Sequence, residues 1–358
     1  MNKYVFFFLS IIIFSCNSNQ NNDSAIAQPK ENNSLSLTEY WSYPNEEMKY
    51  TGGIKMIPIS TPKGEFKVWT KTMGNNPTMK VLLLHGGPGM THEIYECFNS
   101  WFPQEGIEFI YYDQLGSYYS DQPSDTSLWT IERFVDEVEQ VRTALNLDSE
   151  NFYLFGQSWG GILAMEYALK YQNNLKGLII SNMMASIPEY NKYAHEVLGP
   201  QLPPDVLKEI MEMEKNEDYE NPRYAELLME YHYTEHVLRK PIDQWPEAVN
   251  RGLKHMNPEV YIYMQGYSEF GISGDATLKE WDRTQNISEI KVPTLVIGSS
   301  HDTMDPKHME WMASEIPYSD FLLCPEGSHL SQYDDQKTFF NGLINFIKDV
   351  DSGDFQKM

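Results

Sequence analysis

Cysteine and basic residues are both scarce in this chain of 358 residues. Three cysteines exclude a small scaffold stapled by several disulfides. Lysine and arginine number 27 against 51 aspartates and glutamates, and the formal net charge is −24. A surface of that sign repels a phosphate backbone, so we expect no binding of nucleic acid. The hydrophobic content of 41% is ample for a large folded core.

Patterns that bind metals or nucleotides are also absent from the sequence. The nine histidines are scattered, and neither an H-E-x-x-H motif nor a paired C-x-x-C motif occurs. There is no Walker-A loop, and no G-x-G-x-x-G follows the first expected strand. We therefore expect neither a metal site nor a cofactor.

No apolar run is long enough to span a bilayer, which needs about 20 residues. The run Tyr4–Phe14 is shorter, and it ends beside Cys16, ahead of a polar stretch rich in Asn and Ser. This pattern resembles a bacterial lipoprotein signal. We expect residues 1–15 to be the signal peptide, Cys16 to carry the lipid and 16–45 to form a flexible tether. The protein would then be exported and anchored to a bacterial membrane, on its periplasmic or cell-surface face; an ordinary signal peptide is the alternative.

After removal of such a signal and lipidation of Cys16, only Cys97 and Cys324 would be left as thiols. The two could form one disulfide, but the sequence does not show that they meet. Isolated buried thiols are the simpler expectation.

Short apolar runs alternate with helical patterns over most of the chain, which predicts a doubly wound, mostly parallel α/β sheet. The region 185–282 breaks this alternation: it has no strong strand pattern, and its many prolines suit a set of short helices. We expect this region to be a helical cap, or lid, inserted into an α/β core made of 46–184 and 283–358. The expected strands are Phe66–Thr70, Lys80–Leu84, Glu108–Tyr112, Phe152–Phe155, Leu178–Ser181, Thr294–Ile297 and Phe321–Leu323.

The strongest chemical pattern is G-Q-S-W-G-G at residues 156–161, which follows an expected strand and opens an expected helix. That context is typical of a nucleophile elbow, where a tight turn exposes the serine at the carboxyl end of a sheet. Glycines on either side of the serine avoid clashes with neighbouring backbone. Ser158 is therefore the predicted nucleophile.

A serine hydroxyl needs a general base, and the base needs an acid to orient it. In this type of fold the chain order is serine, acid, histidine. Asp302 and His329 follow the last two expected strands, in that order, at the sheet edge that holds Ser158. Asp305 is the rival acid.

Backbone N–H groups must also stabilise the oxyanion of the tetrahedral intermediate. Trp159 supplies one by its position after the nucleophile. The second is expected from Gly87, in the segment H-G-G-P-G at 85–89, directly after the strand Lys80–Leu84. His85 is expected to be structural, because the base is already assigned.

Together, H-G-G-P-G and G-Q-S-W-G-G resemble the proline iminopeptidases, serine peptidases of the α/β-hydrolase fold, with the closest likeness to the tricorn-interacting aminopeptidase branch. The likeness extends through Y-Y-D-Q-L-G at 111–116, E-F-G-I-S-G at 269–274 and G-S-H-L at 327–330, and it covers nearly everything after about residue 45. It implies that Glu269 binds the free α-amino group of the substrate. Relatives often carry a second glutamate after the triad aspartate; here that position is Thr303, with Asp305 close by.

The resemblance implies a serine aminopeptidase that releases N-terminal residues, with proline preferred, from short peptides or amides. One alternative is an amidase or carboxylesterase on the same scaffold that needs no free amino terminus. The other is a lipid-anchored binding protein that has lost catalysis. Fold alone does not separate these, since one scaffold hosts many chemistries.

Overall fold

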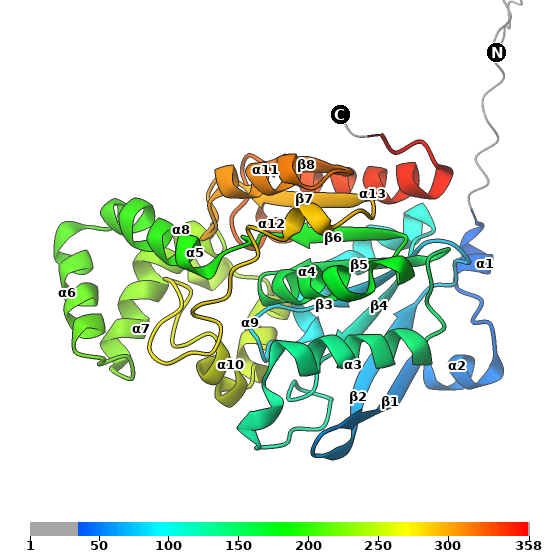
Figure 1. The fold of residues 1–358 in the computed structure, drawn as a ribbon, viewed down its shortest axis with the longest axis horizontal. Coiled ribbons are helices and arrows are strands. Elements are labelled where there is room, and N and C mark those ends of the chain that lie inside the picture. Colours follow the sequence, from blue (N-terminus) through cyan, green and yellow to red (C-terminus); the bar gives the residue numbers. More distant parts are fainter. Residues whose placement is uncertain (1–34, 357–358) are drawn as a thin grey trace, which may run out of the picture. The chain divides into compact units, whose positions relative to one another are not determined.

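The computed structural model describes residues 35–356, and its centre is an eight-stranded sheet with helices on both faces (Figure 1). Strand order across the sheet is β1-β2-β4-β3-β5-β6-β7-β8. β2 is antiparallel to both of its neighbours, and all other neighbouring strands are parallel. The strands are β1 (Ile54–Thr61), β2 (Gly64–Met73), β3 (Lys80–Leu84), β4 (Glu108–Asp113), β5 (Phe152–Gln157), β6 (Gly177–Ser181), β7 (Thr294–Ser299) and β8 (Ser319–Cys324).

Helices cover both faces because the central strands are apolar on both sides. In β3, Leu82 and Leu84 join the core beneath one set of helices, whereas Val81 and Leu83 join the core on the other side. This arrangement confirms the predicted doubly wound, mostly parallel fold. The first face carries α3 (Ile131–Ala144), α4 (Trp159–Tyr171) and α11 (Pro306–Glu315), and the second carries η1 (His92–Ser100), η2 (Phe102–Glu105) and α13 (Gln336–Ser352).

One strand, β1, was not predicted from the sequence. Pro58 lies inside it and reads as a strand breaker, yet Ile57 and Ile59 are buried in the core. The proline is tolerated because β1 is an edge strand that pairs only with β2.

Residues 185–282 form a segment inserted between β6 and β7, which we call the helical insertion (Figure 1). Its two ends lie side by side: the Arg283 amide donates to the Ala185 carbonyl at 2.7 Å, and the Ile187 amide donates to the Trp281 carbonyl at 2.9 Å. The chain therefore leaves and re-enters the sheet layer at one place. The helices of the insertion are α5 (Ile187–Tyr193), η5 (Ala194–Leu198), η6 (Gly199–Gln201), α6 (Pro204–Lys215), α7 (Pro222–Leu228), η7 (Met229–Tyr233), α8 (Thr234–His236), η8 (Ile242–Gln244), α9 (Glu247–His255) and α10 (Pro258–Met264).

Six further short helices connect or flank these elements. Two precede the sheet, and the other four lie in connections of the core. They are α1 (Leu37–Tyr40), α2 (Glu46–Thr51), η3 (Thr126–Leu128), η4 (Gln172–Asn174), η9 (Ile287–Glu289) and, close to the last helix, α12 (Ser331–Asp334).

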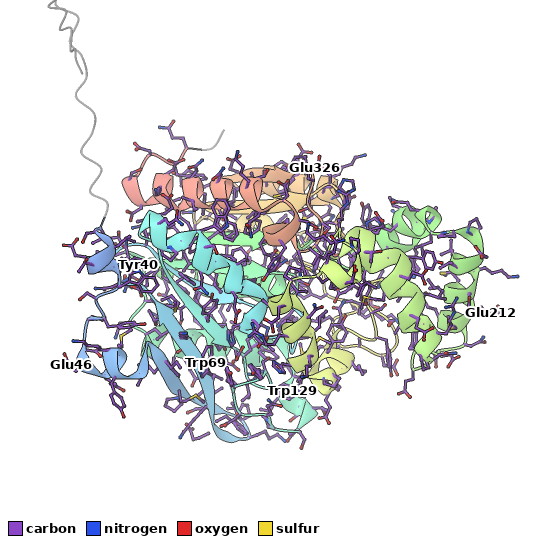
Figure 2. The ribbon with its side chains drawn as sticks, turned by 180° about the vertical axis from the view of Figure 1, so that it is seen from behind. Tyr40, Glu46, Trp69, Trp129, Glu212 and Glu326 are labelled. Atoms are coloured by element: carbon purple, nitrogen blue, oxygen red, sulfur yellow. The ribbon has the colours of Figure 1, made fainter. Side chains whose placement is uncertain are left out.

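The predicted tether over 16–45 is wrong at its C-terminal end. Tyr40, at the end of α1, is fully buried, and its hydroxyl donates to the Ile107 carbonyl at 2.9 Å (Figure 2). Burial of an aromatic ring is strongly favourable, so this segment belongs to the fold. The predicted signal peptide and Cys16 lie outside the described residues.

Cys97 and Cys324 are free thiols, so no disulfide joins them. Across residues 35–356, none of the helices has the combination of length and apolar character that crossing a membrane requires.

Candidate active site

Three loops at the carboxyl ends of parallel strands carry the predicted triad. Ser158 follows β5, Asp302 follows β7 and His329 follows β8. Ser158 and His329 line the same cavity, and Asp302 is fully buried behind the histidine. Parallel strands end at one edge of a sheet, which is why residues so far apart in sequence converge here.

The turn around Ser158 has the strain that an elbow requires. Its backbone φ is 56° and ψ is −128°, a region that non-glycine residues rarely adopt. A Cβ on Gly156 would lie 2.0 Å from the Gly160 carbonyl oxygen, and one on Gly160 would lie 2.1 Å from the Leu84 carbonyl oxygen. Only glycine fits at these two positions, so the pattern read from the sequence is explained by close backbone approach.

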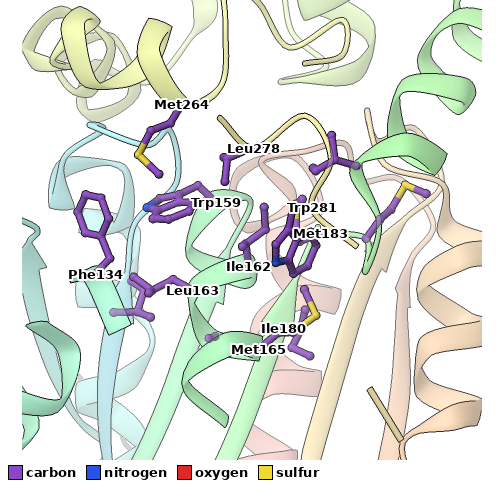
Figure 3. Close-up of a cluster of buried hydrophobic side chains, with 14 of the residues drawn as sticks. Phe134, Trp159, Ile162, Leu163, Met165, Ile180, Met183, Met264, Leu278 and Trp281 are labelled. Atoms are coloured by element: carbon purple, nitrogen blue, oxygen red, sulfur yellow. The ribbon is translucent and has the colours of Figure 1, made fainter. Parts of the chain in front are cut away.

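The side chain of Trp159 anchors the start of α4 rather than facing the cavity. Figure 3 shows its ring beside Phe134 of α3 and below Met264 of α10, and the Phe134 ring centre lies 5.3 Å away. Its indole N–H donates to Gln114 Oε1 at 2.8 Å. The fixed ring in turn fixes the backbone amide that follows Ser158.

Asp302 and His329 form a close buried pair. His329 Nδ1 lies 2.8 Å from Asp302 Oδ1. The other carboxylate oxygen accepts from Asn182 Nδ2 at 2.7 Å. Thr303 Oγ1 lies 3.3 Å from Asp302 Oδ1 and 3.2 Å from His329 Nδ1. Both oxygens of the Asp302 carboxylate are thus held by hydrogen bonds. The carboxylate can therefore orient the imidazole of His329 through Nδ1, so that Nε2 stays available on the cavity side.

Burial alone would lower the pKa of His329, but the charge of Asp302 and its hydrogen bond outweigh burial, and the pKa is raised. A base with this environment stabilises the imidazolium that forms when it takes a proton.

The loop after β3 brings its glycines against the serine. A Cβ on Gly86 would lie 3.0 Å from Ser158 Cβ, and Gly87 has a φ of +102°. His85 secures this loop: the Gln114 amide donates to its Nε2 at 3.1 Å, and its Nδ1 lies 2.9 Å from the Gly86 carbonyl oxygen. Burial lowers the pKa of His85 to about 4, so it is neutral and structural at pH 7.

Sheet loops and the helical insertion together enclose a cavity of about 170 Å³. Its wall is mainly apolar and aromatic, as in most small-molecule sites. The lining residues are Gly86, Gly87, Met90, Ile94, Gln157, Ser158, Tyr233, Val237, Trp245, Val249, Leu253, Met256, Tyr261, Tyr267, Glu269, His329 and Leu330.

Glu269 is the only acidic residue among those lining residues. The Tyr261 hydroxyl donates to its Oε1 at 2.6 Å, whereas its Oε2 is buried and has no hydrogen-bond partner among the described residues. Its backbone is held as well, since its amide donates to the Tyr233 hydroxyl at 3.0 Å and its carbonyl accepts from the Tyr190 hydroxyl at 2.9 Å. Burial raises the pKa of Glu269, against the pull of His329 and the Tyr261 hydrogen bond. A fixed carboxylate with one open oxygen is suited to a cationic group.

Asp305 and Thr303 lie in different surroundings. Asp305 caps α11, where its Oδ1 accepts from the Lys307 amide at 2.9 Å, and it does not line the cavity. Thr303 is buried against the triad pair. Neither residue therefore supplies a second carboxylate to the cavity wall.

Sequence reasoning missed two contributors to the site. Asn182 comes directly after β6, at the same sheet edge as the triad, and that position was the available signal. Tyr261 had no signal, because a tyrosine on a short amphipathic helix reads as core. In the described part of the chain, no cluster of three or more His, Cys, Asp and Glu side chains has the arrangement needed for a metal ion.

Comparisons with known proteins agree with this geometry. Residues 80–336 match the family described as alpha/beta hydrolase fold. A proline iminopeptidase of Flavobacterium johnsoniae is 62% identical over 295 residues, covering 82% of this chain and 98% of the relative. A proline iminopeptidase of Elizabethkingia meningoseptica is 61% identical over 300 residues, covering 84% of this chain and 100% of the relative.

Among solved structures, the crystal structure of a proline iminopeptidase of Mycobacterium smegmatis superposes with a TM-score of 0.74 at 28% identity. The match covers 84% of this chain and 99% of that one. The chain belongs to the α/β-hydrolase family and, within it, to the proline iminopeptidases, which are serine hydrolases.

Proposed function

We propose that this protein is a serine aminopeptidase that releases N-terminal residues, with proline preferred, from short peptides or amides. The observation that carries the proposal is a glutamate, Glu269, whose Oε2 is buried without a partner among the described residues, in the same cavity as Ser158 and His329. A hydrolase that needs no free amino group has no use for a desolvated carboxylate there, because an unpaired buried charge is costly.

The roles follow from the contacts. Ser158 attacks the scissile carbonyl while His329 takes its proton, and His329 later gives that proton to the leaving amine. Asp302 orients the imidazole and stabilises its cation, helped by Asn182. The backbone N–H groups of Gly87 and Trp159 stabilise the oxyanion. Water then releases the free amino acid from the acyl-enzyme.

Recognition of the amino terminus rests on one carboxylate. Glu269 Oε2 pairs with the substrate ammonium, and the attraction is strong because this oxygen is buried. Tyr261 holds the other oxygen and so fixes the direction of the free one. The distance between this carboxylate and Ser158 sets how many residues precede the scissile bond.

A Glu269→Gln variant tests this recognition. We expect kcat/KM for prolyl p-nitroanilide to fall by about 10²- to 10³-fold, since truncating a buried charge pair costs several kcal/mol. The glutamine keeps the size of the side chain and its hydrogen bond from Tyr261. The fall should be far larger than that for p-nitrophenyl acetate, which has no amino group.

Glu259→Gln is the matched control, because Glu259 is exposed on α10 and does not line the cavity. It should leave both substrates unaffected. Equal losses on both substrates in Glu269→Gln would show a structural effect and remove the amino-terminus role from the proposal.

The location of the protein is proposed on the sequence alone: export followed by anchoring through a lipid on Cys16. The support is the apolar run Tyr4–Phe14 that ends beside this cysteine. In a bacterial host fed an alkyne-labelled fatty acid, we expect the full chain to be labelled and a Cys16→Ser variant to be unlabelled. Equal labelling of both, or labelling of neither, would contradict the anchor.

A further inference from the structure

The active-site cavity has a closed end and an open end. Glu269 Oε2 is buried at the closed end. Leu253 of α9 lines the same cavity and is 36% exposed, and the lining side chains of Met90 and Met256 are half-buried. If the ammonium sits on Glu269, as the proposed function has it, the part of the substrate after the scissile bond extends toward α9 and the solvent.

The wall along this route is apolar and comes from two elements. Met90 lies just before η1 and Ile94 lies within it. Val249 and Leu253 lie on α9, and Met256 directly follows that helix. We call these five residues the exit wall. No charged side chain lines this part of the cavity among the described residues, so a charged substrate group there would lose its hydration without gaining a partner.

Ion pairs and close packing hold the two halves of the exit wall together. Glu93 of η1 is buried, and it pairs with Arg251 Nη1 at 2.7 Å and with His255 Nδ1 at 2.8 Å, both from α9. A Cβ on Gly252 would lie 2.9 Å from Ile94 Cγ2, so the helix sits directly on η1. These contacts also turn the charged groups of Arg251 and His255 toward η1. The exit wall is therefore formed before substrate binds.

We propose that the exit wall is a subsite for an apolar side chain on the residue that follows the scissile bond. The substrates selected by it are short peptides with a small first residue and an aliphatic or aromatic second residue. Apolar contact here strengthens the complex in proportion to the area removed from water.

The test compares dipeptide amides that differ only in the second residue. Prolinamide, which lacks that residue, reports the basal reaction. We expect kcat/KM for Pro-Leu amide to exceed that for Pro-Gly amide and Pro-Asp amide by about 10-fold or more. Hydrolysis of prolinamide together with equal values for the three dipeptide amides would overturn the subsite and leave the proposed function standing. Failure to hydrolyse any of the four would overturn the proposed function itself.

A charge placed in the exit wall gives a second readout. In Leu253→Asp, the ratio of kcat/KM for Pro-Leu amide to that for Pro-Lys amide should fall by about 10-fold or more. The leucine side chain loses an apolar contact and would desolvate the carboxylate, whereas the carboxylate attracts the lysine side chain. Ile262→Asp is the matched control: Ile262 is similarly exposed on α10 and does not line the cavity, so its ratio should equal that of the wild type. An unchanged ratio in Leu253→Asp, or the same change in both variants, would overturn the proposal.

Discussion

A Ser158→Ala variant is expected to lose about 10⁵- to 10⁶-fold in kcat toward prolyl p-nitroanilide, since triad residues act as a unit and the nucleophile has no substitute. The fold should persist, because the loss is a single oxygen atom at a position whose backbone is set by the glycines around it. The measurement is steady-state kinetics on the chain that starts after Cys16, with a thermal melt to check folding.

Ser288→Ala is a suitable control for this variant, because Ser288 is exposed in η9 and does not line the cavity. Its kcat should equal that of the wild type. A Ser158→Ala activity within about 10-fold of the wild type would mean that another group performs the attack, and the triad account would be wrong.

Asp302→Asn is expected to lower kcat by about 10⁴-fold, because the amide removes the charge that orients His329 and stabilises its cation. It should also change the pH profile. Protonated His329 cannot accept the Ser158 proton, so kcat/KM falls as the pH drops through the pKa of His329, which Asp302 raises. With p-nitrophenyl acetate as substrate, the midpoint of this fall in kcat/KM, which we call the acid limb, should lie above the ordinary histidine pKa of about 6.5 in the wild type. Asp302→Asn should move this midpoint to lower pH.

The rival acid provides the matched control. Asp305→Asn keeps a good cap for α11, because asparagine accepts the Lys307 amide equally well, so activity, acid limb and melting temperature should stay close to those of the wild type. The reverse outcome, with Asp305→Asn inactive and Asp302→Asn active, would assign the acid to Asp305.

The central sheet was predictable because its strands are short, apolar on both faces and bounded by turn residues. Buried parallel strands have this pattern whatever their neighbours are. β1 escaped prediction because its proline is acceptable only at a sheet edge, and edge position is a property of the whole sheet. Tyr40 escaped for a similar reason: its burial depends on Ile107, 67 positions away in the chain.

The triad was predictable because each member follows a strand of the same sheet, so local pattern and chain order were enough. The surroundings of Glu269 were not. Tyr190, Tyr233 and Tyr261 reach it from three separate helices of the helical insertion, and their convergence depends on how short helices pack. The single hydrogen bond that leaves Oε2 open is likewise a tertiary feature.

The exit wall illustrates the same limit. Leu253 and Met256 read as ordinary apolar residues of an amphipathic helix, and only the packing of α9 on η1 turns them into cavity lining. Arg251 and His255, which neighbour them in the sequence, read as part of a solvated face, yet both pair with the buried Glu93.

The most direct test of the account is the ratio of kcat/KM for prolyl p-nitroanilide to that for N-acetylprolyl p-nitroanilide. The two substrates share the scissile bond and leaving group, and only the first can place an ammonium on Glu269. We predict a ratio of about 10³ or more, with both activities abolished in Ser158→Ala. A ratio near one would contradict the account: it would mean that the triad hydrolyses amides without reading a free amino terminus, as an amidase or esterase does.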